Sequence, residues 1–278
     1  MDLEEHKVTL YAVLDGVATI TLSRPDRMNA WTGRMHTEYR ALLQRAADDP
    51  SVRVIVVTGA GRSFCIGADS KALETHVERG SYDAGVGDDL ARPGYGVRPE
   101  FDADFAYHFG IPKPIIAAIN GPAAGVGLVL ACYCDLRFAA AGVKLTTSHG
   151  RLGLPAEYGL SWLLPRLIGL TRANDLLLSS RVVLSEEAAT LGLVNQVVTP
   201  EQLLPVTYAY AAMLATEVAP SSLAVTKLQI YRDLHGDVAS SVHDAGARMA
   251  HMMQGADFAE GVAALTERRP PRFPDTAG

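Results

Sequence analysis

Two glycine-rich segments of the chain could hold a developing negative charge with backbone N–H groups. Segment 61–71 contains Gly67-Ala68-Asp69 and follows a continuous apolar run at 52–58. Segment 120–127 follows a second such run at 114–120. These runs predict strands buried on both faces, and open α/β sheets bind ligands at the carboxyl ends of their strands. A helix that begins in the second segment would add free N–H groups and the positive end of its dipole.

One glutamate and one histidine later in the chain could move protons. Glu157 stands just before 160–167, which has a helical pattern, and His149 lies eight residues before Glu157. A glutamate in apolar surroundings has a raised pKa and suits a general base, and histidine titrates near neutrality. Taken alone, Glu157 is better explained as a residue of a solvated turn or as a favourable charge at the helix start. His149 is equally consistent with a polar residue that only lines a pocket.

The elements that must position these residues alternate between strands and helices. Segments 8–14 and 17–22 predict a hairpin around Asp15-Gly16, and the spacing of apolar residues predicts a helix over 31–48. The pattern predicts an α/β body with a parallel sheet up to about residue 199 and a helical portion over 200–278. The other predicted elements are a helix at 125–134, strands at 137–141 and 194–198, and helices at 209–217, 221–234, 238–253 and 258–267.

Segment 74–105 differs from the rest of the chain. It is rich in Gly, Asp and Arg, contains Pro93 and Pro99, and has no sustained hydrophobic period. Long segments of this kind in compact domains are functional lids or disordered insertions. The composition predicts either a flap over the pocket or a solvated insertion.

The overall composition argues against several classes of protein. The chain has 278 residues, a net charge of −6 and no block of like charges, which disfavours a nucleic-acid or anionic-membrane surface. No apolar run is long enough to span a bilayer, and the acidic N-terminal residues favour a cytoplasmic protein. Cys65, Cys132 and Cys134 lack metal-ligand spacing and are expected to be buried thiols, so no metal is predicted.

The motifs together resemble those of the crotonase superfamily, also called the enoyl-CoA hydratase/isomerase family. The resemblance rests on four segments in the family's order and covers about residues 8–265. It implies a crotonase-like (ββα)n superhelix with parallel sheets, and a helical C-terminal portion that forms homotrimers, often paired into homohexamers. The segments are Gly-Ala-Asp at 67–69, Asn-Gly-Pro-Ala-Ala-Gly-Val-Gly at 120–127, Leu-Pro-Arg-Leu-Ile-Gly at 164–169 and Gly-Leu-Val-Asn at 192–195.

The resemblance implies an acyl-CoA substrate and an oxyanion hole made by the N–H groups of Ala68 and Val126. Both would point at the thioester oxygen, which becomes negative in an enolate, and one such donor stabilises a transition state by about 3–4 kcal/mol. Val126 stands where the family usually has glycine, so its isopropyl group should narrow the acyl pocket. Coenzyme A would enter as part of the substrate, and no permanently bound cofactor is implied.

The resemblance also implies which residues hold coenzyme A. The loop at 65–70 would hold the adenine through its backbone, and three cations, Arg24, Arg27 and Lys71, are candidates for the phosphates. A solvated surface charge is the alternative for each cation. The loop candidates are Cys65, Ile66, Ala68, Asp69 and Ser70.

The choice of reaction depends on three positions. By resemblance, Val129 and His149 stand where a typical hydratase has its two catalytic glutamates, so simple hydration is disfavoured. Glu157 matches the base of isomerases that move a β,γ double bond to α,β, and His149 would be a second acid/base or would orient Glu157. The alternatives are a hydratase with an atypical residue set, a thioester hydrolase or dehalogenase that uses Glu157 as nucleophile, and a non-catalytic acyl-CoA binder.

Overall fold

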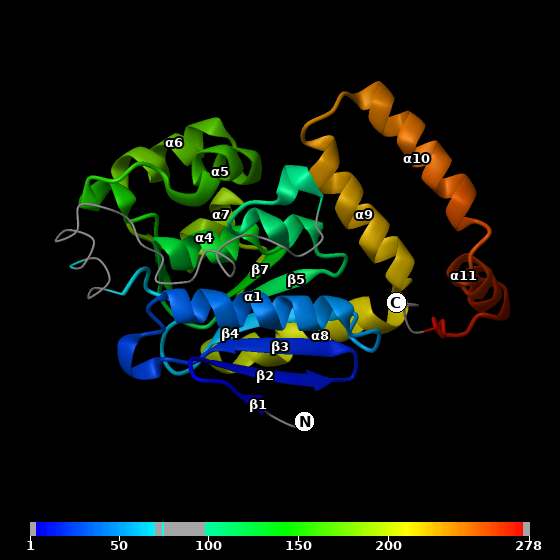
Figure 1. Cartoon of the computed structure of the whole chain (residues 1–278), viewed down its shortest axis with the longest axis horizontal. Coiled ribbons are helices and arrows are strands. Elements are labelled where there is room, and N and C mark those ends of the chain that lie inside the picture. The colour runs from blue at the N-terminus through cyan, green and yellow to red at the C-terminus, as the bar shows by residue number, and fades with distance from the viewer. Residues whose placement is uncertain (1–3, 70–73, 75–97, 275–278) are drawn as a thin grey trace.

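The computed structural model of the chain describes residues 4–69, 74 and 98–274, and a seven-stranded sheet lies at its centre (Figure 1). β1–β3 are antiparallel, and from β3 onward each neighbouring pair is parallel, which confirms the predicted α/β class. The strand order is β1 (Glu4–Glu5), β2 (Thr9–Leu14), β3 (Val17–Leu22), β4 (Val54–Gly59), β5 (Ile115–Ile119), β7 (Leu136–Ala140) and β10 (Gln196–Val198).

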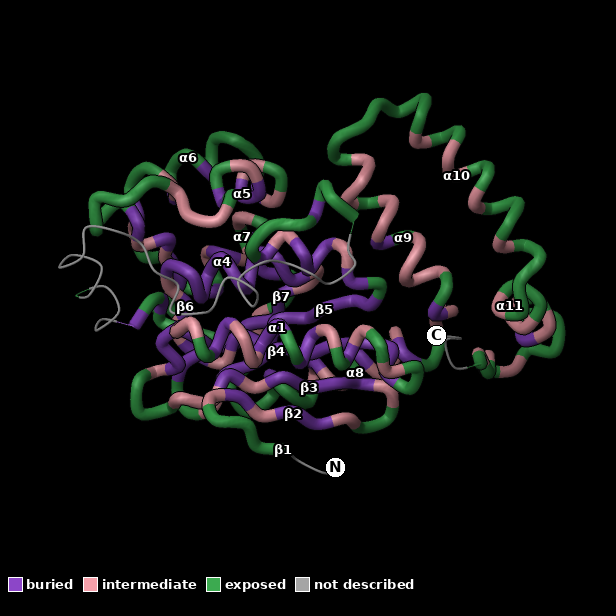
Figure 2. The backbone as a smooth tube through the Cα atoms, viewed as in Figure 1, coloured by how far each residue is buried: buried purple, intermediate pink, exposed green. Residues whose placement is uncertain are grey.

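The hairpin between β2 and β3 forms at the predicted place. Asp15 and Gly16 both have positive φ angles, 48° and 77°, which are the left-handed conformations that a type I′ hairpin turn requires. β4 and β5 are wholly buried, as their continuous apolar runs predicted. The centre of the sheet is therefore the core of the molecule (Figure 2).

A second, three-stranded sheet has no counterpart among the sequence predictions. It consists of β6 (Ala123–Ala124), β8 (Lys144–Thr146) and β9 (Val183–Leu184), in that order. Strands of two or three residues are too short to show a period of two. β6 belongs to the glycine-rich segment 120–127, so its pairing with β8 helps to fix the position of that segment.

Nine α-helices occur in the described part of the chain, and the body helices pack on the sheet. α1 contacts β2 and β3, and α8 contacts β4 and β5. Thr32 caps α1 by accepting a hydrogen bond from the N–H of Met35. The helices are α1 (Gly33–Asp48), α4 (Val126–Tyr133), α5 (Leu160–Ile168), α6 (Leu170–Ser179), α7 (Ser185–Leu191), α8 (Leu203–Glu217), α9 (Pro220–Asp233), α10 (Val238–Met252) and α11 (Ala256–Glu267).

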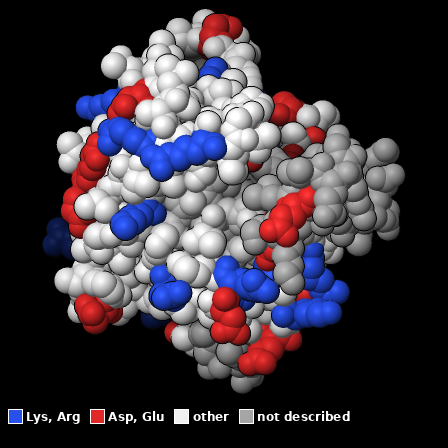
Figure 3. Space-filling view, turned by 90° about the vertical axis from the view of Figure 1, so that its left-hand side faces the viewer, with Lys and Arg blue, Asp and Glu red and all other residues white. Residues whose placement is uncertain are grey.

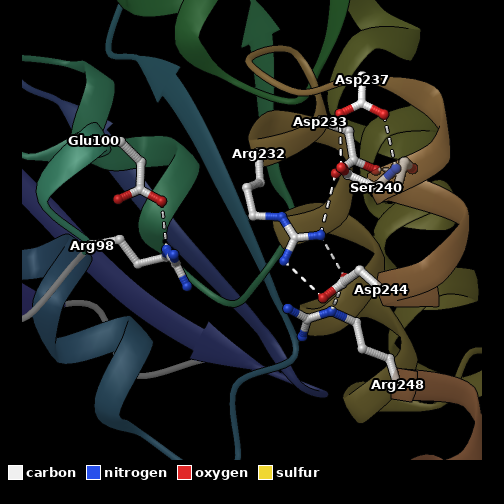
Figure 4. A network of polar contacts seen from close by, with 9 residues as sticks. Arg98, Glu100, Arg232, Asp233, Asp237, Ser240, Asp244 and Arg248 are labelled. Carbon is white, nitrogen blue, oxygen red and sulfur yellow. Dashed lines mark hydrogen bonds and ion pairs between the residues drawn. The ribbon is translucent and has the colours of Figure 1, made fainter. Parts of the chain in front are cut away.

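α10 and α11 extend away from the body, and most of their surface is exposed (Figures 1 and 2). A polar network fixes the turn that joins α9 to α10. Arg232 of α9 donates to Asp244 of α10 at 3.0 Å, and Arg248 pairs with the same carboxylate (Figure 4). The side chain of Asp237 caps α10 by accepting from the N–H of Ser240. These contacts set the angle of α10 without a buried core between the two helices.

The described end of segment 74–105 contains two buried aromatic side chains. Pro99–Phe101 and Ala106–Gly110 form 3-10 helices, and the side chains of Phe101 and Phe105 are buried in the core. Two aromatic side chains therefore anchor residues 98–105 to the core, while the other six residues of this range are exposed. Residues 75–97 lie outside the described residues, so the flap hypothesis stays a prediction.

The loops that follow β4 and β5 touch backbone to backbone. A Cβ atom on Gly121 would lie 2.1 Å from the carbonyl oxygen of Arg62, a distance that no side chain tolerates. The Asn120 side chain accepts from the N–H of Gly59 at 3.1 Å and donates to its carbonyl at 2.8 Å. The glycine permits the contact and the asparagine holds it. No described helix is both long and apolar enough to cross a membrane.

Replacing Gly121 by alanine should destabilise the protein, because the new methyl group must displace backbone rather than a flexible side chain. We expect a loss of at least about 1–3 kcal/mol in the free energy of unfolding, measured by urea denaturation. Gly246→Ala is the matched control, because Gly246 lies in α10 with open space around it. That variant should gain roughly 1 kcal/mol from helix propensity. Equal effects of the two substitutions would contradict the packing argument.

Candidate active site

The loop that carries Ala68 is anchored to the segment before α1. The N–H of Trp31 donates to the carbonyl of Gly67 at 2.8 Å, and the N–H of Asp69 donates to the carbonyl of Trp31 at 3.0 Å. Trp31 and Ala68 thus form an isolated parallel bridge. Gly67 has a φ angle of 103°, which a residue with a side chain rarely adopts. The bridge leaves the N–H of Ala68 on the side away from Trp31.

A guanidinium group fixes the end of the same loop. Arg24 donates to Asp69 at 2.9 Å through one nitrogen and to the carbonyl of Ala30 at 2.5 Å through another. Both side chains of the pair are largely buried, at 21% and 12% exposure. The fork geometry of arginine allows both contacts at once. Arg24, a predicted phosphate ligand, is therefore engaged in holding the loop of Ala68.

The second loop packs directly against the first. The N–H of Ala124 donates to the carbonyl of Cys65 at 3.0 Å, and the N–H of Cys65 donates to the carbonyl of Pro122 at 3.2 Å. A Cβ atom on Gly127 would lie 2.0 Å from the carbonyl oxygen of Cys65. Cys65 thus joins the two loops, and its buried thiol has a pKa raised to about 12 by burial.

α4 begins at Val126, and Gly125 makes the turn into it with a φ angle of 50°. Within the described ranges, the N–H groups of Ala68 and Val126 have no hydrogen-bond partner. Free N–H groups are expected at a helix start, and they favour an anion there. Both residues line a cavity of about 260 Å³. Its lining residues are Ile66, Gly67, Ala68, Gly125, Val126, Ser148, His149, Arg151, Leu152 and Glu157.

Glu157 begins the 3-10 turn Glu157–Gly159 and faces the same cavity. One oxygen of its carboxylate lies 3.8 Å from the place where a Cβ atom of Gly125 would stand. No other described residue makes a hydrogen bond to this carboxylate. Burial raises the pKa of Glu157, and the neighbouring His149 opposes part of that rise. A carboxylate with these properties can accept a proton from a bound ligand.

His149 lines the cavity beside Glu157 and is 5% exposed. Its Nε2 atom lies 3.1 Å from the carbonyl oxygen of Leu177 in α6. A carbonyl only accepts, so Nε2 carries a hydrogen, and Nδ1 accepts whenever it carries none. Nδ1 is buried and has no partner among the residues that the structure describes. The site thus contains a buried, unsatisfied ring nitrogen in addition to the Glu157 carboxylate and the two N–H groups.

Known proteins match this chain over nearly its whole length. The enoyl-CoA hydratase/isomerase family model matches residues 13–276. The chain belongs to the enoyl-CoA hydratase/isomerase family. It is 38% identical to the probable enoyl-CoA hydratase EchA12 of Mycobacterium tuberculosis, over 93% of this chain and 90% of that protein. It is 33% identical to the 1,2-epoxyphenylacetyl-CoA isomerase of Escherichia coli, over 93% and 95% of the two chains.

The fold agrees with the same family. The crystal structure of a probable enoyl-CoA hydratase/isomerase from Mycobacterium abscessus superimposes with a TM-score of 0.84 and 31% identity. The superposition covers 99% of this chain and all of that chain. The sequence resemblance to the crotonase family, and the crotonase-like fold that it implied, are thereby confirmed.

The structure brings the four predicted catalytic residues to one cavity. Ala68, Val126, His149 and Glu157 all line it. Val129 is buried and lies outside the lining, so it contributes no group to the chemistry. The roles that the sequence assigned to these four residues stay predictions. Their place around one cavity agrees with those roles but does not test them.

The predicted coenzyme A ligands lie in different surroundings. Ile66 is 40% exposed at the cavity, and Arg27 is exposed after β3. Cys65 is buried, and both of its backbone groups bond to the neighbouring loop. Ser70 and Lys71 lie outside the described residues. The coenzyme contacts of all these residues stay predictions.

Sequence reasoning missed Ser148, Arg151 and Leu152, which also line the cavity. They belong to the turn that places His149, and Ser180 holds that turn by accepting from the N–H of Gly150 at 3.0 Å. No pattern in the sequence marks them, because the contact with Ser180 joins segments far apart in the chain. Figure 3 shows the end of the molecule at the left of Figure 1, where Lys and Arg as well as Asp and Glu side chains border a largely uncharged area.

Arg24→Lys tests whether Arg24 holds the loop or binds a phosphate. Lysine cannot contact both Ala30 and Asp69, so we expect kcat/KM to fall about tenfold, as for one lost charge-assisted hydrogen bond of about 1.5 kcal/mol. The loss should be equal for acyl-CoA and for the matching acyl-pantetheine, which lacks the adenosine phosphates. A loss confined to acyl-CoA would instead assign Arg24 to the phosphates.

Proposed function

We propose that this protein moves the double bond of a β,γ-unsaturated acyl-CoA to the α,β position, with Glu157 as the base. As a member of the enoyl-CoA hydratase/isomerase family, the protein is an enzyme that acts on an acyl-CoA thioester. One observation carries the finer proposal. Among the described residues that line the cavity, Glu157 is the only carboxylate, and it lies beside the two free N–H groups.

The proposed reaction needs one proton carrier and one anion site. Glu157 takes a proton from C2 of the acyl chain. The electron pair of that C–H bond becomes the C1–C2 π bond, and the carbonyl π pair moves onto the thioester oxygen. The N–H groups of Ala68 and Val126 donate to this oxygen and stabilise the dienolate. The carboxyl group then returns the proton to C4, and the double bond is left between C2 and C3. No other reactant is consumed.

The environment of Glu157 supports this role. Burial raises its pKa toward the range in which a carboxylate both accepts and returns a proton efficiently. The absence of a hydrogen-bond partner among the described residues leaves both carboxylate oxygens available to the substrate. A cavity of about 260 Å³ suits the reacting end of an acyl chain rather than the whole substrate.

Hydration of an enoyl-CoA is the second candidate, and the unpaired Nδ1 atom of His149 favours it. This acceptor could hold or deprotonate a water molecule while Glu157 acts as the acid. In hydration, the hydroxyl group of water adds to C3 and a proton adds to C2. The relative EchA12 is named a probable enoyl-CoA hydratase, whereas the Escherichia coli relative is named an isomerase.

Coenzyme A is proposed to lie along the loop that holds Ala68, as part of the substrate. Ile66 offers an exposed apolar side chain at the cavity, and Arg27 is an exposed cation after β3. The thioester must enter with its oxygen toward Ala68 and Val126, which sets the acyl chain toward Glu157. The same loop would thus serve both the coenzyme and the oxyanion.

Glu157→Gln should abolish most of the activity, because an amide cannot accept the C2 proton. We expect kcat on 3-enoyl-CoA to fall by about 10²–10⁴ while KM changes little. The assay follows the conversion of 3-enoyl-CoA and of 2-enoyl-CoA in deuterated water by mass spectrometry. Isomerisation gives 2-enoyl-CoA, with deuterium at C4 to the extent that the Glu157 proton exchanges with solvent before its return, and hydration gives a product heavier by one water. Full activity of the variant on both substrates would overturn the proposal.

Two controls accompany that variant. Glu217→Gln changes an exposed glutamate at the end of α8 and should leave the rate unchanged. The second control is the pH profile of kcat for the unmodified enzyme. Only the deprotonated carboxylate is a base, so kcat should fall on the acid side, with a midpoint above the usual value of 4.5 because burial raises the pKa of Glu157. The acid limb should disappear in Glu157→Gln.

The protein is further proposed to assemble as a homotrimer through its C-terminal helices. α10 exposes an apolar stripe formed by Val238, Val242 and Met249, which are 80%, 68% and 63% exposed and share one face of the helix. A second copy of the chain is the partner that the family resemblance implies. A stripe of this kind in water favours burial against another chain.

Val242→Glu should weaken the assembly, because it places a charge in the apolar stripe. Light scattering after gel filtration should report about three times the chain mass of 29.7 kDa for the unmodified protein and a lower mass for the variant. His243→Glu adds a charge at the next exposed position, off the stripe, and should keep the assembly. A monomeric unmodified protein would contradict the proposal.

A further inference from the structure

Tyr133 joins the helix that begins at the oxyanion hole to the turn that carries Glu157. We propose that Tyr133 is a positioning residue, which sets the place of the Glu157 carboxylate relative to the N–H of Val126. The inference rests on the proposed role of Glu157 as the base. Tyr133 does not line the cavity, so it acts through the turn and not on the substrate.

The link is a hydrogen bond between two elements. The hydroxyl group of Tyr133, at the end of α4, donates to the carbonyl of Tyr158 at 2.7 Å. The side chain is almost wholly buried, and burial raises the pKa of Tyr133 to about 12. The hydroxyl therefore keeps its proton over the working range of pH and remains a donor. Tyr158 directly follows Glu157, so the bond holds the residue next to the base.

The turn held by this bond is unfavourable without support. Tyr158 has φ and ψ angles of 48° and 39°, and Gly159 has 72° and 15°, so two successive residues are left-handed. A residue with a side chain rarely adopts this conformation unless its surroundings require it. The Tyr133 hydroxyl lies 3.0 Å from the place where a Cβ atom of Gly159 would stand. The hydroxyl thus both fills the turn and satisfies its carbonyl.

α4 makes the link rigid. Val126 is its first residue and Tyr133 its last, and all eight residues are buried. At a rise of 1.5 Å per residue, the helix separates the two ends by roughly 10 Å. The N–H that receives the oxyanion and the hydroxyl that holds the base turn are therefore attached to one short, packed element. A shift of the turn relative to α4 would change the distance between base and oxyanion hole.

Phe105 supports the ring of Tyr133 independently of the hydroxyl. The two rings stack at 6.2 Å, and the ring of Phe105 also meets that of Tyr158 edge to face at 5.0 Å. A variant that keeps the ring of residue 133 should therefore keep this packing. Only the hydrogen bond to the turn would be lost.

Tyr133→Phe is the variant that tests the inference. The carbonyl of Tyr158 loses the hydrogen bond from residue 133, and the left-handed turn can relax and move Glu157. We expect kcat on 3-enoyl-CoA to fall about 10–100-fold, because small displacements of a catalytic group have effects of this size. KM should stay within about twofold, because the N–H groups of Ala68 and Val126 do not move. The same holds for the affinity for an unreactive 2-oxoalkyl-CoA thioether, which keeps the carbonyl oxygen. An unchanged kcat would overturn the inference.

A matched control separates positioning from general destabilisation. Tyr231 in α9 donates to Asp135 at 2.7 Å, and this bond lies outside the cavity and its turn. Tyr231→Phe removes a tyrosine hydroxyl of the same kind and should lower the melting temperature without the loss in kcat. A fall in kcat as large as that of Tyr133→Phe would overturn the positioning role.

The double variant distinguishes the failure of this inference from failure of the proposed function. If Tyr133 acts through Glu157, Tyr133→Phe should cause no further loss in a Glu157→Gln protein. Losses that multiply would show that Tyr133 acts elsewhere, while Glu157 remains the base. Full activity of Glu157→Gln alone would remove the proposed function and this inference together, whatever Tyr133→Phe does.

Discussion

The close approach of two backbone loops is the constraint on which the rest of this structure depends. The loops after β4 and β5 meet where glycines leave no room for a Cβ atom, 2.0 Å from the carbonyl of Cys65 at Gly127 and 2.1 Å from that of Arg62 at Gly121. Neighbouring parallel strands deliver both loops to one edge of the sheet. The N–H groups of Ala68 and Val126 can line one cavity only because the backbones come this close.

The site collects polar groups that the fold leaves unsatisfied. Most buried donors and acceptors in proteins have partners. Among the described residues, the N–H groups of Ala68 and Val126, the Nδ1 atom of His149 and the carboxylate of Glu157 have none, and all four residues line one cavity. Around them the bonding is dense, with Arg24 on Asp69 and Tyr133 on Tyr158. The hydrogen bonds around the site thus offset the free energy that is lost by leaving these groups without partners.

Local patterns predicted most elements well, and their failures have a physical cause. Continuous apolar runs located β4 and β5, and the Asp15-Gly16 pair located the hairpin turn, because both signals are local. The strands of the small sheet were missed because two or three residues show no period. The burial of Phe101 and Phe105 at the end of segment 74–105 was not predicted, because it depends on partners distant in sequence.

The sequence by itself determined the fold class, the family and the identity of four of the residues that line the site, because glycine spacing and apolar runs are properties of neighbouring residues. Tertiary structure alone decided what surrounds those four residues. It turned Arg24 toward Asp69, added Arg151 to the cavity wall and tied the turn of Glu157 to α4 through Tyr133. Hydrogen bonds between residues 25 and 45 positions apart leave no local pattern, so only the folded chain reveals them.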